Sequence, residues 1–414
     1  MGNGRQKDRM TSDSRTRVLR AFRHEEPDRT PVFEYVLLAA SIWRAVLGRL
    51  PVQGDWETAV REQGWEKAVR HLTIDYLDLA DALGHDLVYV TPNPPPPVRP
   101  ISATTRQKAP SSDDPAERVA ARTRWQQTAY TGVNEDTLLV YRLLHDEMTL
   151  RGMDLPILAP AYAHGIWTDT DLMQTLLLAP EIAHEHFAFA TRRAGDQIDC
   201  YAALGLDLIG IGGDFAGNVP LISPVCYRRF IVPELHSLSD RIHCAGKLAV
   251  NASDGNLWNV LDDFLLHSGV DGYLEIDSHA GMKLAPLKAG YGRRITFLGN
   301  LDCGNLLSFG TEEQIRQAVT ECLDAGTGDG GHILTASNAI TDSVPVASYL
   351  AAANAYRDYF GLPRLKPASA HQKRSGCIKN NIVDAKPAAY NRTQRTNPVH
   401  IHTTQRSVEK KERR

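Results

Sequence analysis

Acidic, hydroxyl and amide side chains follow a series of short apolar runs in this sequence, and their chemistry suits an enzyme site. Carboxylic acids can move protons or hold a cation, while tyrosine, histidine and asparagine can hold a small polar molecule. We expect five of these residues to be catalytic: Tyr162, Asp214, Glu275, Asp302 and Asn338. We expect seven others to bind substrate: Glu34, Tyr35, Asn93, His164, Asn251, Asp254 and Asn300. Any one of them alone is more often a helix cap or a loop-ordering group, so the prediction depends on their convergence.

Several carboxylates gathered at one site would repel each other, so they need a bound cation or raised pKa values. One hypothesis is therefore a divalent metal such as magnesium or manganese, held by Asp214, Glu275 and Asp302. The other is a carboxylic acid with a raised pKa that acts as a general acid on a neutral substrate.

Other hydrolytic and metal chemistries lack their motifs. No GxSxG nucleophile elbow and no HExxH zinc motif occurs in the sequence. The six cysteines are scattered without a CxxC pair, which argues against a disulfide framework or a closed zinc site. Adjacent His243 and Cys244 do not make a metal site by themselves.

The elements that would position these residues alternate between short apolar runs and longer helical patterns. The expected strands span residues 30–35, 86–91, 156–160, 206–212, 247–251, 272–276, 294–298 and 332–336. Eight such alternations predict a (β/α)₈ TIM barrel, whose active site lies where the strands end. A doubly wound sheet is the alternative, but it would want a glycine-rich turn after its first strand, where residues 34–37 offer none.

Composition divides the chain into three parts. Residues 1–13 and 366–414 are expected to be disordered, and residues 14–365 to form the barrel. The tail carries 12 Lys and Arg against three acids and few aromatic residues, so a nucleic-acid partner is not expected.

An alternating stretch around Gly132 within residues 104–150 predicts a hairpin insertion after the second strand. No apolar segment is long enough for a membrane helix, and no signal peptide is evident, so a cytoplasmic location is expected.

Four segments, in the correct order, resemble the uroporphyrinogen decarboxylase superfamily. They are AFRHEEPDRTPV at 21–32, GGDFAGNVPLISPVCYRRFIVP at 212–233, LGNLDCGNLL at 298–307, and residues 331–340. This resemblance spans about residues 14–365 and implies a TIM barrel, often as a homodimer.

The resemblance implies one of two chemistries. Decarboxylation of a tetrapyrrole needs no cofactor; it implies an arginine-rich loop after the first strand, an aspartate near Asn93, a tyrosine at Tyr162 and a histidine at Asn338. The sequence has no such arginine cluster, although a polycarboxylate substrate needs cationic partners. Methyl transfer with a corrinoid protein implies a zinc-binding HxC pair at Asn251 and Ser253 and a cysteine at Asn338. None of these three is a zinc ligand.

We therefore expect a divergent enzyme of this superfamily acting on a small molecule. The leading expectation is a decarboxylase-like carbon–carbon lyase for a tetrapyrrole or a smaller carboxylated substrate. The alternatives are a methyltransferase or demethylase that works with a corrinoid protein, and a catalytically silent ligand-binding barrel.

Overall fold

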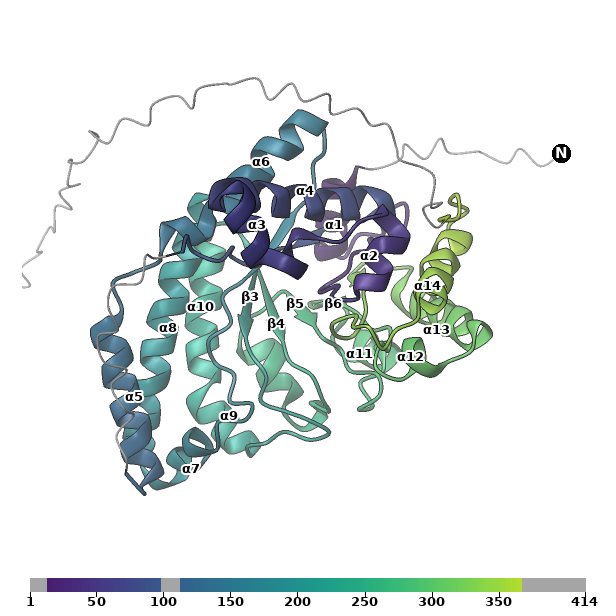
Figure 1. Cartoon of the computed structure of the whole chain (residues 1–414). Coiled ribbons are helices and arrows are strands. Elements are labelled where there is room, and N and C mark those ends of the chain that lie inside the picture. The colour runs from purple at the N-terminus through teal and green to yellow at the C-terminus, as the bar shows by residue number, and fades with distance from the viewer. Residues whose placement is uncertain (1–12, 98–111, 367–414) are drawn as a thin grey trace, which may run out of the picture. The chain divides into compact units, whose positions relative to one another are not determined.

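A curled, wholly parallel sheet organises the computed structural model, which describes residues 13–97 and 112–366 (Figure 1). Within these residues its seven strands pair in chain order from β1 to β7. They are β1 Val88–Tyr89, β2 Ile157–Pro160, β3 Leu208–Gly212, β4 Leu248–Ala252, β5 Gly272–Leu274, β6 Thr296–Leu298 and β7 His332–Ile333. Their side chains are almost all buried on both faces, as expected for a parallel sheet covered by helices.

The expected first strand, residues 30–35, is not a regular strand. Val32 forms a single parallel bridge with Leu334, and the Val32 carbonyl accepts a hydrogen bond from the Asp86 amide at 2.8 Å. This segment therefore lies between the two outer strands of the sheet. A ladder cannot extend along it because Pro31 has no amide proton and the Val32 amide donates to the Asp86 carboxylate at 3.1 Å.

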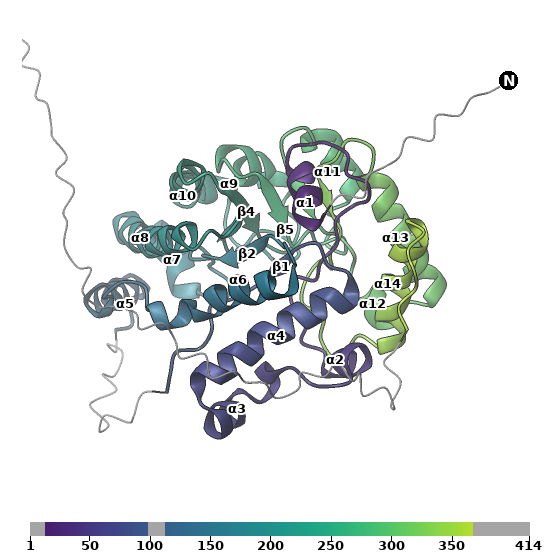
Figure 2. The ribbon, with the colours of Figure 1, turned by 90° about the horizontal axis from the view of Figure 1, so that it is seen from above.

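Helices surround the sheet when it is viewed from above (Figure 2). In the first half of the described chain they are α1 Ser14–Phe22, α2 Ala40–Leu47, α3 Trp56–Gln63, α4 Trp65–Leu83, α5 Pro115–Ala129, α6 Leu139–Arg151, α7 Thr170–Leu178 and α8 Pro180–Ala203. In the second half they are α9 Pro224–Phe230, α10 Val232–Cys244, α11 Leu284–Tyr291, α12 Leu306–Phe309, α13 Glu312–Gly326 and α14 Val346–Tyr359. None of the described helices is long and apolar enough to cross a membrane.

The expected hairpin insertion is wrong for the described part of residues 104–150, which forms helices α5 and α6. Asp114 caps α5 through the Ala116 amide, and Pro115 takes the first helical position. In α6 the buried residues Val140, Leu144 and Met148 recur every fourth position, which is helical spacing. The apparent alternation around Gly132 was too short to distinguish from that pattern.

Residues 257–267 contain a 3₁₀ turn, Trp258–Val260, and a π-helical turn, Asp263–His267. Two side chains donate hydrogen bonds to the main-chain carbonyl of Phe264. The Asn251 amide donates to it at 3.0 Å, and the Ser268 hydroxyl donates to it at 2.6 Å. Such insertions into the main-chain ladder distort a helix.

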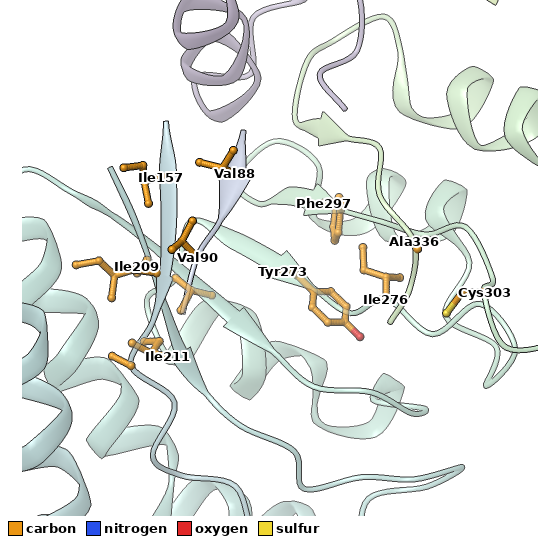
Figure 3. Close-up of a cluster of buried hydrophobic side chains, with 14 of the residues drawn as sticks. Val88, Val90, Ile157, Ile209, Ile211, Tyr273, Ile276, Phe297, Cys303 and Ala336 are labelled. Carbon is orange, nitrogen blue, oxygen red and sulfur yellow. The ribbon is translucent and has the colours of Figure 1, made fainter. Parts of the chain in front are cut away.

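Apolar side chains pack on both faces of the sheet, and they alternate along each strand. The inner cluster joins Val250 and Leu274 to Val18 and Phe22 of α1, so α1 covers the end of the sheet where the strands begin. The outer cluster packs the other face against the helices, and Figure 3 shows part of it, including Ile209 and Phe297. The opposite end of the sheet, where the strands finish, is left for the site.

Residues 1–12, 98–111 and 367–414 lie outside the described residues. The expectations of a disordered N-terminus and of a disordered basic tail fall there. Asp13, which was assigned to that N-terminus, instead caps α1 by accepting from the Thr16 amide at 2.6 Å.

Candidate functional site

Four of the expected site residues line one cavity of about 380 Å³. Tyr35 follows the segment that bridges the outer strands, Tyr162 follows β2, Asp214 follows β3, and Glu275 follows β5. Residues separated by up to 240 positions in the chain therefore converge at the carboxyl ends of the strands. This is the edge at which parallel α/β folds bind their ligands.

Two glycines let the loops after β2 and β3 meet at this cavity. Gly213 has a φ of 133°, and a Cβ there would lie 2.7 Å from the Gly165 amide nitrogen. A side chain at either position would push the two loops apart. The close approach places Tyr162 and Asp214 beside the same space.

Glu275 has an unusual backbone and an unusual electrostatic environment. Its φ of 69° lies in the left-handed region, which residues with a Cβ rarely adopt, and only 8% of the residue is exposed. Burial raises its pKa well above the ordinary value, and the negative charges of Asp254 and Asp214 raise it further. Hydrogen bonding from Tyr35 opposes this rise. Glu275 is thus a carboxyl group held towards its neutral, proton-bearing form.

A second cavity, of about 540 Å³, shares Asp214 with the first and is lined by Asp254, Asp302 and Asn338. The Asn338 amide donates to Asp254 Oδ2 at 2.6 Å, which links the loops after β4 and β7. Burial raises the pKa of Asp254 to about 6, against the hydrogen bond from Asn338. Burial also raises the pKa of Asp214.

The two cavities are acidic. Their described lining residues include five carboxyl groups and no lysine or arginine, and His279 is the only histidine among them. One of the five, Asp302, also orders its own loop by accepting from the Asn305 amide at 2.9 Å. An anionic ligand would find no cationic side chain in these linings.

Glu34 lines a third cavity, of about 80 Å³, on the other side of Tyr35. Burial raises the pKa of Glu34 to about 7. Its neighbours there include Trp43 and Leu79. Glu34 is therefore adjacent in sequence to Tyr35 of the first cavity, but its side chain lines a separate space.

Four residues expected to bind substrate line none of these three cavities. Asn93 accepts from the Val140 amide at 2.9 Å and so fixes the start of α6. His164 is buried, stacks on Phe187, and lies 2.9 Å from the Thr191 hydroxyl; burial lowers its pKa to about 3.

The other two residues are held by backbone groups. Asn251 donates to the Phe264 carbonyl, and Asn300 donates to the Met282 carbonyl at 2.9 Å. Each of the four is a buried polar group with a structural partner, which is the commoner role of such residues.

Several residues that line the two cavities were not among those expected from the sequence, and Trp167 and Ala252 are two examples. Trp167, half-exposed, lines the second cavity from the loop after β2. Ala252 lines the first cavity at the end of β4. Trp167 could have been predicted from its position shortly after a strand. Ala252 could not, because an alanine has no functional group that would indicate a site.

The end of β4 shows which side chains of this segment face the cavities and which face the helices. Asn251 points to the helix layer, while Ala252 and Asp254, two positions apart, line the two cavities. Together with Asn338 they offer one carboxylate, one amide and no thiolate or imidazole. This set does not fit zinc, which wants three or four nitrogen or sulfur ligands.

The magnesium or manganese hypothesis also fails on geometry. Glu275 lines the first cavity and Asp302 the second. In residues 13–97 and 112–366, no three histidine, cysteine, aspartate or glutamate side chains are placed to hold a metal ion. Asp214, Glu275 and Asp302 therefore do not form the expected cation site.

Comparisons with known proteins point to one family. The model of the uroporphyrinogen decarboxylase (URO-D) family matches residues 59–359, well over half of the chain. A methylated-thiol–coenzyme M methyltransferase from Methanosarcina mazei is 27% identical over 161 residues, which is 39% of either chain. A solved methyltransferase structure from Methanosarcina mazei superposes with a TM-score of 0.60 at 18% identity, covering 84% of this chain and 99% of that one. The structural likeness shows a shared fold.

Proposed function

Because the chain belongs to the uroporphyrinogen decarboxylase family, whose members are enzymes, we propose that it transfers a methyl group from a small molecule to an acceptor. This reverses the order of our two sequence-based expectations, in which decarboxylation came first. A corrinoid protein is the acceptor that the family resemblance implies, and it would supply the nucleophile that takes the methyl group.

The observation that carries this proposal is the charge of the two linked cavities. A tetrapyrrole with several carboxylates would need arginine or lysine partners. The described linings instead offer five carboxyl groups, among them Asp214 and Asp302, and no basic side chain. Repulsion between like charges disfavours such a substrate, whereas a neutral methyl donor meets no such penalty.

The matched relatives support the same choice. The relative from Methanosarcina mazei is named for methyl transfer from methylated thiols to coenzyme M, and the solved structure is also a methyltransferase. The alignment spans only 39% of that relative's length, so its substrate and acceptor are proposals for this chain.

The residues of the first cavity have separate tasks in this function. The hydroxyl-bearing rings of Tyr35 and Tyr162 line the space where the donor would lie. Small residues at Gly165, Gly213 and Ala252 leave room for it. Glu275 in this lining is buried, and hydrogen bonds in such a low-dielectric setting are stronger than in water.

The test compares the two chemistries on the purified chain. Dimethyl sulfide is offered as the methyl donor with free cob(I)alamin as the acceptor, and the absorbance of the cobalamin is followed. In a parallel reaction, uroporphyrinogen III is offered and its products are separated by chromatography. We expect methylation of cobalamin and no loss of carboxyl groups. Decarboxylation of uroporphyrinogen, or no methyl transfer above the protein-free rate, would overturn the proposal.

A further inference from the structure

We infer that Glu275 is the general acid of this site and that it protonates the heteroatom from which the methyl group departs. The donors would then be neutral methyl thioethers or methyl ethers. This inference rests on the proposed methyl transfer and adds its substrate class and its acid.

The position of Glu275 supports the assignment. The residue directly follows β5, lines the first cavity beside Asp214, and is 92% buried, so its carboxyl group meets a bound molecule rather than bulk water. Its backbone, with a φ of 69°, lies in the left-handed region, which is strained for a residue with a Cβ. Strain of this kind collects at functional sites, because the side chain must be held in one place.

The poor fit of a metal leaves the activation of the substrate to a proton. Ala252, Asp254 and Asn338 offer a single anionic oxygen donor between them. Without a Lewis acid, a thiolate or alkoxide is a poor leaving group at neutral pH. A carboxylic acid beside the leaving atom removes that barrier, and such proton transfer contributes typically about 10²–10⁴-fold to a rate.

The step balances in atoms and electrons. The nucleophile of the acceptor forms a bond to the methyl carbon, and the bond between carbon and sulfur or oxygen breaks with its electron pair on the heteroatom. Glu275 gives its proton to that heteroatom, and a neutral thiol or alcohol leaves. Glu275 becomes a carboxylate and regains a proton from solvent before the next turnover.

The groups around Glu275 suit both halves of this cycle. Asp214 after β3 and Asp254 after β4 disfavour its charged form before the reaction. Tyr35 hydrogen-bonds to the carboxylate once the proton has gone. The electrostatic neighbourhood also includes three tyrosines on other strands or loops: Tyr89, Tyr162 and Tyr273. Among the described residues that line the first cavity, none is an arginine or a lysine.

A first experiment needs no substrate. The protein is labelled with ¹³C only at the glutamate side-chain carboxyl carbon, and the Glu275 resonance is assigned by its disappearance in Glu275→Gln. We expect its chemical shift at pH 7 to be that of a protonated carboxyl group. The Glu62 side chain, assigned in the same way through Glu62→Gln, serves as the solvent-exposed reference. A Glu275 resonance that matches Glu62 at pH 7 overturns the inference and leaves the proposed methyl transfer standing.

A second experiment separates acid catalysis from binding. Wild type and Glu275→Gln are compared with dimethyl sulfide, which leaves as a thiolate unless protonated, and with trimethylsulfonium, which leaves as neutral dimethyl sulfide. We expect the variant to lose at least about 100-fold in turnover with dimethyl sulfide and less than about 10-fold with trimethylsulfonium. Glu62→Gln should match wild type with both donors.

Equal losses with the two donors, or no loss, overturn the role of Glu275 while methyl transfer stands. Absence of transfer by wild type from both donors overturns the proposed function and this inference together. Circular dichroism melting of Glu275→Gln accompanies the comparison, so that a loss of fold is not counted as a loss of catalysis.

Discussion

The backbone of Glu275 makes a measurable demand on the residue at that position. A left-handed φ costs a residue with a Cβ about 1–2 kcal/mol, whereas glycine adopts it freely. We therefore predict that Glu275→Gly is more stable than Glu275→Ala, with a free energy of unfolding that is greater by about 1 kcal/mol. Both variants lack the carboxyl group, so urea denaturation of the pair isolates the backbone. A Glu275→Ala variant as stable as Glu275→Gly would contradict the φ of 69°.

Asp254 couples stability to pH. Its pKa is raised to about 6 in the folded chain, above its ordinary value of 3.8. Folding therefore favours the protonated form of Asp254. The contribution of this group to the free energy of unfolding is greatest below about pH 4 and is lost as the pH rises through about 6. We predict that, between pH 4 and pH 7, the free energy of unfolding falls by about 2 kcal/mol less in Asp254→Asn than in wild type. Urea denaturation across this range checks it, with the exposed Asp81→Asn as the control. Parallel pH profiles for Asp254→Asn and wild type would contradict the prediction.

At the scale of single elements, the sequence predicted most of the fold because its signals were local. Thr311, for example, caps α13 in a capping box with Gln314, and a threonine followed three residues later by glutamine is a signal that can be seen in the sequence. The strands fall within the expected ranges, except that β4 ends one residue later than expected, at Ala252, because each strand is a short buried run between turn residues. Residues 30–35 were misjudged because a tertiary contact, from Val32 to Asp86, takes the amide that a ladder would need.

That contact belongs to an ionic network that holds α1 and the following segment to the sheet. Asp86 is fully buried and accepts from Arg17 and Arg29, each at 2.6 Å. Removing the carboxylate breaks the ion pairs of Asp86 with Arg17 and Arg29, although Arg17 keeps its pair with Asp28, and loss of one partner of a buried pair typically costs about 3–5 kcal/mol. We predict a loss of that size for Asp86→Ala in chemical denaturation. Asp81→Ala, on the exposed side of α4, should change stability by less than about 0.5 kcal/mol. A similar small change for Asp86→Ala would show that the network contributes little.

Sequence reasoning predicted the site less completely than the fold. Tyr162, Asp214 and Glu275 were identified because parallel strands bring their carboxyl ends to one edge. Asn251 was misassigned because strand ends are uncertain by a residue, and a shift of one position moves a side chain to the opposite face. Asn93 and Asn300 illustrate a second limit, since a buried amide after a strand serves a loop as readily as a ligand.

At the scale of the whole molecule, the two ends of the sheet have different tasks. α1 closes the end where the strands begin, and its Val18 and Phe22 join the inner apolar cluster. The other end gathers the acidic groups that lack basic neighbours in the cavity lining. The apolar packing that stabilises the fold and the acidic groups of the site therefore lie at opposite ends of the sheet. Carboxyl groups that would destabilise an apolar core can thus be placed beside a bound molecule.

The same arrangement predicts what would turn the chain into a zinc protein. Ala252, Asp254 and Asn338 line the linked cavities, and the last two are in contact at 2.6 Å. The triple variant Ala252→His, Asp254→Cys, Asn338→Cys supplies one imidazole and two thiolates, which is a sufficient set for a zinc site with one open position.

We predict that this variant binds one zinc ion per chain by elemental analysis after dialysis, and that wild type retains none in stoichiometric amount. The matched variant Asn251→His, Ser253→Cys, Asn338→Cys should not bind zinc at this site, because Asn251 points towards Phe264 in the helix layer. Stoichiometric zinc in the matched variant alone would show that the residues facing the cavities are Asn251 and Ser253. Zinc in wild type would show that the cavities hold a metal with the side chains they already have, and it would remove the reason for assigning the activation of the substrate to a proton on Glu275.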